Sequence, residues 1–556
     1  MTEKKFNLID EPWIRAIATD GEEKTYSIKD IFLNAHEIAF IAGETELQNT
    51  AVLRLLIAIS VTCFYRYDKN GCESKLTDED QALDRYKAVW DNKKFPEEFI
   101  TGYLDQWHEY FYLIGGSNPF YQVPEKYTRE IDDSKNKSKN PTGKTYLVPP
   151  YTESDKLSWI NAQSFNGEIL QSGNSTSPFA NKSGDIRSIM VLSETARWLV
   201  YYMNFADCSS KIPGKWNAGM TFTSSGADIH PVGKNLFETI MLCSVILDEN
   251  GLLYGEPLPA WEKNTYTHIN DSPYGDAFPD NIPELYTQQS RKAILHCEGD
   301  IVDGIYTAAG DKYGTVNAFI EPMFAFHPDA SDKSGNTNRP NHIAADSTGW
   351  KEFRNVFGGG TKDPTRWIGL LFGKDILSDN INVPYVMTDI SYGSMQCGVE
   401  STVNTRLSVN EKFFIDDIAL ERAKSEVDRI NKIANILDQF GKDIDLAQGA
   451  KSDKKGKLNS AFGKKLRTDY EKVAGELFEK FLVDNITEDE LHKEEVRCAE
   501  KITGKALENL NILSVIGHGE ISIGKAECNF RKSMWRMKKD LGLISEEDSD
   551  KWKNKE

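Results

Sequence analysis

The segment YGSMQCG (392–398) divides the 556-residue chain into two unlike parts, since about seven-tenths of the chain precedes it and a long helical pattern follows it. Two glycines that enclose a serine and an uncharged amide predict a tight, projecting turn whose backbone can approach a partner closely. The amide of Gln396, near the tip of this turn, can both donate and accept hydrogen bonds. Turn chemistry is common, so the same residues are also typical of a surface hairpin with a solvated glutamine.

The chain after this turn is predicted to be helical. Apolar residues recur at helical spacing, as in the series Ile430, Ile433, Ala434 and Leu437. The predicted helices cover about 410–440, 462–481, 488–510 and 525–543. Four amphipathic helices of about 20 residues or more, joined by loops, indicate a C-terminal four-helix bundle.

The chain before the turn carries both strand and helix signals. An apolar run at 6–14 predicts a strand stopped by Pro12, with a partner strand near 25–28, and the apolar segment 44–65 predicts a buried helix. Ser193 is expected to cap a helix that ends near residue 205. Three strands are expected at 291–296, 300–306 and 315–326, with Lys312 at or beside a hairpin tip. We therefore expect an α+β fold, with a large mixed α/β domain at 1–400 followed by the four-helix bundle at 401–556.

Cysteine usage and hydropathy indicate a reduced intracellular protein. The eight cysteines form no C-x-x-C pair and no Cys/His pair at zinc-ligand spacing, so we expect neither disulfides nor a structural metal. The most apolar segment, 51–65, is interrupted by Arg54 and is too short to span a bilayer, and the N-terminus lacks an apolar signal core. We expect a cytoplasmic protein that has no membrane partner.

The formal net charge of −19 argues against a protein that coats nucleic acid over its whole surface, but it permits a local basic site. The connection 206–219 places Lys211 and Lys215 around a proline, and the polar loop at 158–178 is rich in Asn, Gln, Ser and Gly. The polar side chains of 158–178 suit hydrogen bonding to a nucleic-acid backbone. The same residues are also typical of a disordered surface loop, and a lone lysine on a turn is usually only solvated.

Motifs of common enzymes are missing. The chain contains no G-x-x-x-x-G-K-[ST] and no H-E-x-x-H, and Gly358-Gly359-Gly360-Thr361 has neither the lysine nor the strand-to-helix context of a phosphate-binding loop. Catalytic groups assembled from distant residues stay open, because such sites form only in space. The sequence therefore predicts no enzyme and no cofactor.

Six stretches of the chain occur in a familiar order. They are FNLIDEPWI (6–14), FYLIGGSNPFYQ (111–122), SETARWLVYYMNFAD (193–207), GKNLFETIMLCSV (233–245), EPMFAF (321–326) and YGSMQCGVE (392–400). Together they resemble the CasA family, the large subunit of the type I-E CRISPR Cascade complex. The resemblance spans nearly the whole chain, helical tail included.

The resemblance implies a non-catalytic subunit that docks on other Cascade subunits with their CRISPR RNA. Such a subunit inspects double-stranded DNA for a short protospacer-adjacent motif and starts strand separation, while guide pairing reads the long sequence. It reads the motif from the minor groove, whose hydrogen-bond pattern is degenerate. The resemblance also implies that the subunit helps to recruit a separate helicase-nuclease, or that a nuclease is fused to another subunit.

The resemblance also assigns DNA-binding roles by position. Gln396 matches a glutamine wedge, and its neighbours Gly393, Ser394, Met395 and Cys397 form the rest of the turn. Lys312 matches a groove-reading lysine. A third loop, which matches a glycine loop, contains Ser210, Lys211, Gly214 and Lys215, and a fourth, near the motif and the seed, contains Asn161, Gln163 and Asn166.

Two departures bear on which motif is read. The loop that matches the glycine loop is poor in glycine, and Met395 and Cys397 stand where related chains often have an amide and a smaller residue. Two other functions stay open beside the first. One is a metal- or nucleotide-dependent hydrolase with a scattered site, and the other is a helical scaffold with no nucleic-acid role.

Overall fold

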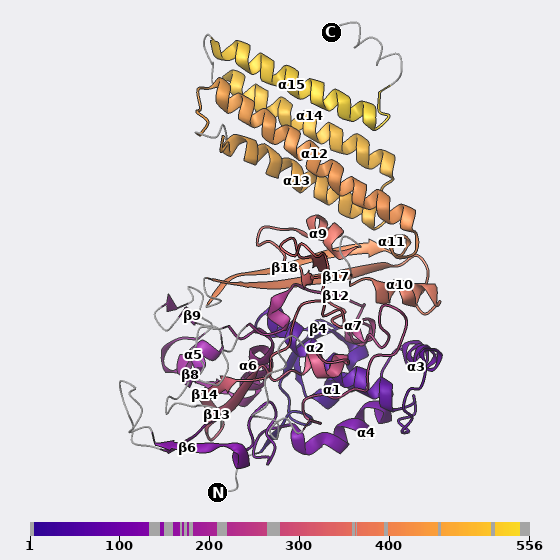
Figure 1. Cartoon of the computed structure of the whole chain (residues 1–556), viewed down its shortest axis with the longest axis vertical. Helices are drawn as coiled ribbons and strands as arrows, with labels where there is room; N and C mark the ends of the chain where they lie inside the picture. The colour runs from indigo at the N-terminus through magenta and orange to yellow at the C-terminus, as the bar shows by residue number, and fades with distance from the viewer. Residues whose placement is uncertain are drawn as a thin grey trace. The chain divides into compact units, whose positions relative to one another are not determined.

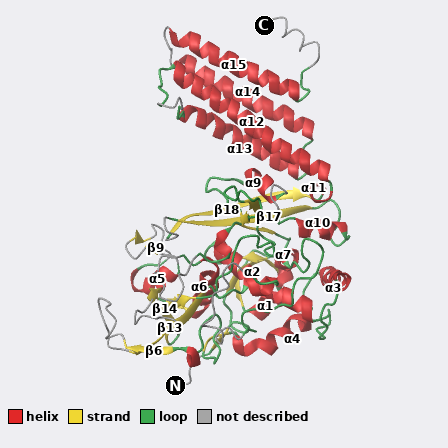
Figure 2. Cartoon of the chain, viewed as in Figure 1, coloured by secondary structure: helices red, strands yellow, loops and turns green. Residues whose placement is uncertain are grey.

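The computed structural model of the chain describes residues 5–132, 145–148, 159–166, 169–171, 175–176, 182–207, 220–263, 278–357, 362, 364–393, 398–453, 458–512 and 518–544. Helices and strands are both abundant (Figure 2), which confirms the α+β fold class. The chain divides into two compact units. Unit 1 comprises Met1–Ser347, Asn355–Ser378 and Pro384–Arg406, and unit 2 comprises Thr348–Arg354, Asp379–Val383 and Leu407–Glu556.

A buried helix, α2 (Glu46–Arg66), forms the centre of unit 1, and α6 (Leu192–Phe205) and α7 (Leu236–Cys243) pack against it (Figure 1). Helix α8 (Ile282–Tyr286) also contacts α2. Its apolar residues face all round, as the sequence predicted, and the Thr45 side chain caps it by accepting from the Gln48 amide. By length and composition α2 could cross a membrane, but 94% of its most apolar window is buried inside the fold. Its extensive contacts with the surrounding helices account for its apolar character.

The charge that interrupts α2 is neutralised in the core. Arg54 is fully buried, and its guanidinium donates to Asp228 Oδ2 at 3.2 Å and to Glu321 Oε2 at 2.6 Å. The Arg54 guanidinium also lies 3.8 Å from the centre of the Tyr286 ring. A buried cation requires such partners, so this network joins three distant parts of unit 1.

The N-terminal strands differ from the prediction. The expected strand at 6–14 is interrupted: β1 (Phe6–Asn7) pairs with β5 (Tyr112–Ile114), and β2 (Ile14–Ala18) lies after Pro12 between β3 (Glu23–Tyr26) and β4 (Ile38–Ile41). The Asn7 side chain causes the interruption, because its Oδ1 accepts from the Ile9 amide at 2.9 Å and its carbonyl accepts from Glu11. The strand expected near 25–28 therefore pairs with β2 instead of the first run.

A second sheet has the order β11-β14-β13, with β8 also paired to β14. Its strands are β8 (Trp159–Asn161), β11 (Met190–Val191), β13 (Arg291–Glu298) and β14 (Ile301–Ala309). The β13–β14 hairpin confirms the first two of the three predicted strands. The third is wrong, since 315–325 contains no strand and only β15 (Phe326–Pro328) follows, paired with β16 (Asn338–Pro340). A positive φ of 53° at Asn317 and a hydrogen bond from the Phe319 amide to the Asn317 carbonyl turn the chain there.

The helix α6 (Leu192–Phe205) begins one residue before its predicted cap. Strand β11 leads directly into it, so Val191 occupies the N-cap and makes no side-chain cap bond. Thr195 Oγ1 instead donates to the Val191 carbonyl at 3.0 Å. The assignment of Ser193 as the N-cap is therefore wrong, whereas the helix itself is confirmed.

A third sheet has the order β12-β17-β18 and includes the long hairpin of β17 (Asn382–Tyr392) and β18 (Val399–Asn410). Strand β12 (Asp228–Pro231) pairs antiparallel with β17. The remaining elements outside the C-terminal helices are α1 (Ile28–Leu33), α3 (Glu79–Asn92), α4 (Glu97–Trp107), α5 (Ala162–Phe165), α7 (Leu236–Cys243), α8 (Ile282–Tyr286), α9 (Gly349–Val356), α10 (Arg366–Gly373), α11 (Lys412–Ile415), β6 (Arg129–Asp132), β7 (Thr145–Val148), β9 (Ile169–Gln171) and β10 (Ser175–Thr176).

Unit 2 contains the four predicted long helices, packed side by side (Figure 1). They are α12 (Asp417–Ala447), α13 (Ala461–Leu482), α14 (Glu488–Ile512) and α15 (His518–Asp540). The first begins later than expected, because Asn410 ends β18 and the Asp416 side chain caps α12 by accepting from two amides. Gly441 and Gly463 let α12 and α13 approach closely, since a Cβ on Gly441 would lie 2.3 Å from the Gly463 Cα.

Candidate functional site

The turn at 392–398 joins β17 to β18. Its ends are closed by a hydrogen bond of 3.0 Å from the Gly393 amide to the Gly398 carbonyl, and Gly398 adopts a φ of +70° that favours glycine. One step further down the hairpin, the hydroxyls of Ser391 and Ser401 lie 2.6 Å apart. The predicted residues Ser394, Met395, Gln396 and Cys397 lie outside the described residues.

The base of this turn is bonded to the end of helix α6. The Gly398 amide donates to Asp207 Oδ2 at 2.8 Å, and the Tyr392 hydroxyl donates to the Phe205 carbonyl at 2.7 Å. Burial raises the pKa of Tyr392 well above its usual range, so its hydroxyl keeps the proton that it donates. Two hydrogen bonds thus fix the position from which the turn departs.

The end of α6 is also where the predicted glycine loop begins. Ser210, Lys211, Gly214 and Lys215 lie outside the described residues, but both flanks of the loop are described. On the far flank, Thr221 Oγ1 donates to the Asn204 carbonyl and Thr223 Oγ1 donates to Asn204 Oδ1 at 3.0 Å. The chain therefore leaves α6 and returns to it, beside the base of the β17–β18 turn.

A buried arginine joins this place to the second sheet. Arg291, only 2% exposed, donates from Nη2 to the carbonyls of Ala206 and Asp207, each at 3.2 Å. Its neighbour Ser290 donates from Oγ to the Met203 carbonyl at 2.6 Å. The start of β13 is thereby fastened to the last turn of α6.

Lys312 lies at the same end of the sheet. The Gly310 amide donates to the Ser290 carbonyl at 3.1 Å, the Asp311 amide donates to the Gln289 carbonyl at 2.8 Å, and Lys292 Nζ lies 3.3 Å from Asp311 Oδ1. Lys312 follows with an exposed side chain. The expectation of a hairpin tip at Lys312 is wrong, because β14 ends at Ala309 and no strand forms at 315–325 to complete a second hairpin.

The fourth predicted loop is partly regular structure, so the expectation of one continuous loop at 158–178 is wrong for its described residues. Asn161 ends β8 opposite Gly304, and its Oδ1 accepts from the Ser164 amide to cap α5. Gln163 Nε2 donates to Ser188 Oγ at 3.2 Å, and Asn166 is only 7% exposed. Asn161 and Gln163 therefore make hydrogen bonds within the fold, and Asn161 lies opposite the middle of β14.

The structure thus brings three segments together: the flanks of the turn at 394–397, the flanks of the loop at 208–219, and the segment that carries Lys312. A continuous series of hydrogen bonds runs from Gly398 to Asp207, from the Asp207 carbonyl to Arg291, and from the start of β13 to Asp311. Sequence reasoning did not single out Asp207 or Arg291. A lone carboxylate after a helix and a lone arginine at the start of a strand carry no distinctive pattern, although Asp207 directly precedes the basic loop.

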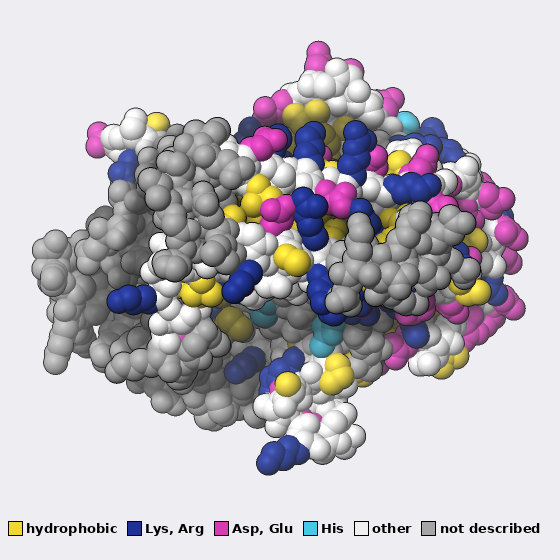
Figure 3. Space-filling view, turned by 90° about the horizontal axis from the view of Figure 1, so that it is seen from above, with side chains coloured by type: hydrophobic (Ala, Val, Ile, Leu, Met, Phe, Trp, Pro, Cys, Tyr) yellow, Lys and Arg dark blue, Asp and Glu magenta, His cyan; other side chains and the backbone are white. Residues whose placement is uncertain are grey.

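Charge on the described surface is mixed. In the view from above, Lys and Arg side chains alternate with Asp and Glu side chains and form no continuous basic field over the described residues (Figure 3). The described residues that meet metal-ligand spacing, Glu426, Glu488 and His492, lie in unit 2, away in sequence from every predicted site residue. The described part of the candidate site consists of backbone groups and polar side chains joined by hydrogen bonds, which suits it to binding.

Comparisons with known proteins agree on one family. The profile of the CRISPR-associated protein Cse1 family matches residues 7–509. The CRISPR-associated protein CasA/Cse1 of Thermus thermophilus is 26% identical over 342 residues, which cover 59% of this chain and 54% of that protein, so the chain aligns with about half of its length.

Solved structures share the fold at low identity. The crystal structure of Thermobifida fusca Cse1 is 18% identical, covers 97% of this chain and 99% of its own, and has a TM-score of 0.76. A chain of a structure described as a CRISPR RNA-guided surveillance complex is 12% identical, covers 95% of this chain and 99% of its own, and has a TM-score of 0.62. Because the family profile spans nearly the whole sequence, the chain belongs to the CRISPR-associated Cse1 family, also called CasA.

Proposed function

We propose that this chain is the large, non-catalytic subunit of a type I-E Cascade complex, in which it recognises the protospacer-adjacent motif in duplex DNA and promotes strand separation and R-loop formation. Membership of the Cse1 family and the fold shared with a chain of an RNA-guided surveillance complex support the assembly. Its partners are the other Cascade subunits with CRISPR RNA, double-stranded target DNA, and a helicase-nuclease or nuclease-fused subunit that it helps to recruit or position. The proposed location is the cytoplasm.

The observation that carries the DNA-binding role is the hydrogen bond between the Gly398 amide and Asp207. It holds the base of the turn that carries Gln396 against the flank of the loop that carries Lys211 and Lys215. A side chain that wedges into a base step meets a cost of a few kcal/mol, which contacts to the opened duplex must offset. A turn that is held at its base can insert a side chain into a base step, whereas a freely moving turn would be displaced by the duplex.

The proposed division of labour follows from the chemistry of the parts. Lys312 and the lysines of the 208–219 loop supply positive charge for phosphates or groove edges, which positions the complex on DNA. Gln396 offers an amide to a base edge or into the opened step. The guide RNA then reads the long sequence by base pairing, so the protein needs to read only the short motif.

The direct test replaces Gln396 by alanine in the assembled complex. Q396A is expected to impair strand opening, measured by 2-aminopurine fluorescence beside the motif, more than it impairs initial binding, measured at low temperature on the same duplex. Gln448→Ala, at an exposed glutamine after α12, is the matched control and should change neither quantity. Equal loss of both quantities, or loss of neither, would exclude the wedge role.

A second test addresses the anchor of the turn. Asp207→Ala removes the carboxylate that accepts from Gly398, so strand opening should fall although Gln396 is retained. Asp207→Asn keeps an acceptor oxygen and should restore most of the opening. If D207A opens DNA as well as the wild type does, the anchored-turn mechanism is excluded while DNA recognition by other residues survives. Metal-dependent nuclease activity of the purified chain, abolished by EDTA, would instead favour a hydrolase.

A further inference from the structure

A cluster of carboxylates and one imidazole lies between two helices of unit 2. Glu426 comes from α12, and Glu488, His492 and Glu495 come from α14 at positions i, i+4 and i+7, which place them on one face of that helix. Glu426 and Glu495 are fully buried, and His492 is 8% exposed. Buried carboxylates require compensation, so this cluster calls for a physical explanation.

The spacing of three of these groups matches a coordination sphere. His492 Nε2 lies 3.0 Å from Glu426 Oε1 and 3.8 Å from Glu488 Oε1, and one ligand atom from each residue lies within 4.8 Å of the others. A metal ion bound at about 2.0–2.2 Å to nitrogen and oxygen ligands separates them by about 3 to 3.6 Å. Small rotations of the three side chains would therefore admit one ion.

A second observation points to a missing partner. Both carboxylate oxygens of Glu495 are buried without a hydrogen-bond partner among the described residues, and so is Oε2 of Glu426. Glu495 follows His492 by about one turn on the same face of α14. The Tyr470 hydroxyl of α13 is also buried without a hydrogen-bond partner among the described residues.

The charges inside the cluster do not balance when its carboxylates are ionised. Arg429 of α12 binds Glu426, and Arg422, at the rim, lies 3.8 Å from Glu488 with a side chain that is 64% exposed. Three carboxylates thus face one buried guanidinium. One divalent cation would balance this charge and supply the partner that Glu426 Oε2 lacks among the described residues.

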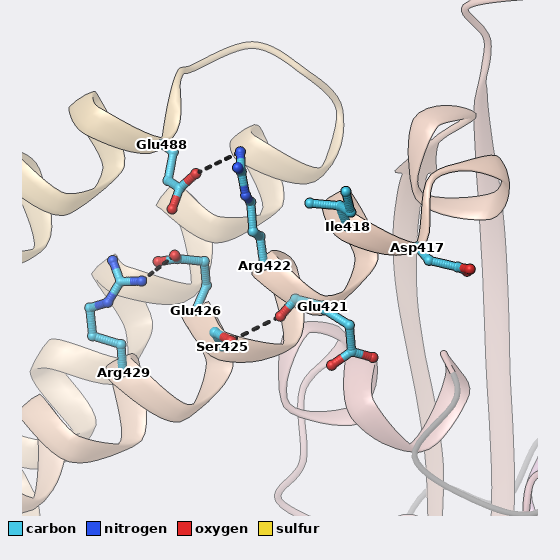
Figure 4. Close-up of a pocket in the computed structure, with 8 residues that line it drawn as sticks. All are labelled: Asp417, Ile418, Glu421, Arg422, Ser425, Glu426, Arg429 and Glu488. Carbon is cyan, nitrogen blue, oxygen red and sulfur yellow. Dashed lines mark hydrogen bonds and ion pairs between the residues drawn. The ribbon is translucent and has the colours of Figure 1, made fainter.

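The cluster is accessible from solvent. A pocket of about 410 Å³, lined by residues of α12 and by Glu488 of α14, opens beside Glu426 and Arg429. In Figure 4 the carboxylates of Glu426 and Glu488 both face the space between these helices, and the Arg422 guanidinium lies beside Glu488. An ion can therefore reach the two carboxylates without unfolding the bundle.

We propose that Glu426, Glu488 and His492 bind one divalent first-row transition-metal ion that ties α12 to α14. One imidazole combined with carboxylates suits Zn²⁺, Fe²⁺ or Mn²⁺ better than Mg²⁺, which prefers oxygen ligands and its own waters. The cysteine pattern predicted no structural metal, so the proposed site departs from that expectation. The ligands were not recognisable in the sequence, because the helix pairing brings Glu426 to a distant Glu-x-x-x-His segment.

The test uses the full chain after removal of metals with EDTA. Zn²⁺ and Mn²⁺ are each titrated by calorimetry, with Mn²⁺ included because it binds thiols weakly, and thermal unfolding is recorded at about 100 times the measured Kd. We expect one ion per chain and a rise in the Tm of the helical unit of about 4 °C or more, against no change with Mg²⁺. If neither Zn²⁺ nor Mn²⁺ binds to the wild type at one ion per chain, the proposal is overturned.

Variants identify the ligands. His492→Gln and Glu488→Gln should each weaken binding by about 100-fold or more, since each removes a direct ligand. Glu488 is 37% exposed, so its variant tests the site even if H492Q fails to fold by circular dichroism. Glu508→Gln, at an exposed glutamate of α14, is the matched control and should bind as the wild type does. Unchanged affinity in E488Q, or in a folded H492Q, overturns the proposed ligand set.

Discussion

Arg291 shows how a single side chain organises the candidate DNA-binding site. Its guanidinium is buried and donates to the carbonyls of Ser290, Ala206 and Asp207. A buried guanidinium is stable only where such acceptors surround it, so the last residues of α6 and the first of β13 are held in one arrangement. The flank of the basic loop and the segment before Lys312 consequently share a support.

Lys312 should contribute to DNA binding through its charge. Lys312→Ala in the assembled complex should weaken binding to motif-bearing DNA and lower the slope of log K against log salt by about one, because one phosphate or groove contact is lost. Fluorescence anisotropy across a series of KCl concentrations measures both effects. Lys333→Ala, at another exposed lysine, should leave the slope unchanged. Equal affinity of K312A and the wild type at every salt concentration would remove Lys312 from the site.

Lys362 should make the stability of unit 1 depend on pH. Burial lowers its pKa from 10.5 to about 8, and Nζ has no hydrogen-bond partner among the described residues. Because the unfolded chain then binds more protons than the folded chain between about pH 8 and 10.5, stability from this group should rise with pH across that window. Lys362→Met should increase the free energy of unfolding near pH 7 by up to about 3 kcal/mol.

The measurement for Lys362 is denaturant unfolding at several pH values from 7 to 10. The difference between K362M and the wild type should shrink as the pH rises, because deprotonation removes the cost in the wild type. Lys374→Met, at an exposed lysine after α10, should show no such difference. A constant difference across the pH range would contradict the argument.

At the scale of elements, the position of Lys312 is set by the β13–β14 hairpin. The two strands stay paired up to Ala309, and the backbone of Gly310 and Asp311 continues along the segment before β13. Gly310 allows this, since a Cβ at this residue would lie 2.1 Å from the Gln289 carbonyl oxygen and 2.6 Å from the Arg291 amide nitrogen. The backbone after β14 therefore lies directly against the start of β13. No larger residue fits there without moving one of the two segments.

Gly310→Ala should therefore destabilise unit 1 by about 1 to 3 kcal/mol, the usual cost of forcing extra volume into a packed site. It should also weaken DNA binding by displacing Lys312. The free energy of unfolding from chemical denaturation tests the first effect. Gly102→Ala, in helix α4 where an added Cβ meets nothing within 4 Å, is the control and should be neutral or stabilising by up to about 1 kcal/mol. Equal stabilities of the two variants would refute the close-approach argument.

At the scale of the whole molecule, the net charge of −19 sets the behaviour of the free chain. The face shown in Figure 3 mixes both signs of charge, and the net charge is negative, so we expect the free chain to be attracted only weakly to DNA at long range. We expect the isolated chain to bind motif-bearing duplexes at least about tenfold more weakly than the assembled complex does at 0.15 M salt, as measured by gel shift. Equal affinities would mean that the chain needs no partner subunits for recognition.

The sequence by itself determined the elements whose signal is local and repeated. Helix α2 and the four C-terminal helices were predictable, because apolar residues recur at helical spacing over 20 or so residues. The β13–β14 hairpin was also predictable from a local signal, namely two apolar runs on either side of a turn. The ordered motifs also indicated the family, which the Cse1 profile confirms over residues 7–509.

Only the tertiary structure decided how these elements meet. Asn7 interrupts a strand through its own side chain, and β11 takes the place of the cap expected at Ser193. Asp207 and Arg291 gain their roles from neighbours that are distant in the chain, and so do Glu426 and His492. Their partners are set by the packing of helices and sheets, because side-chain contacts form between residues that no local pattern relates.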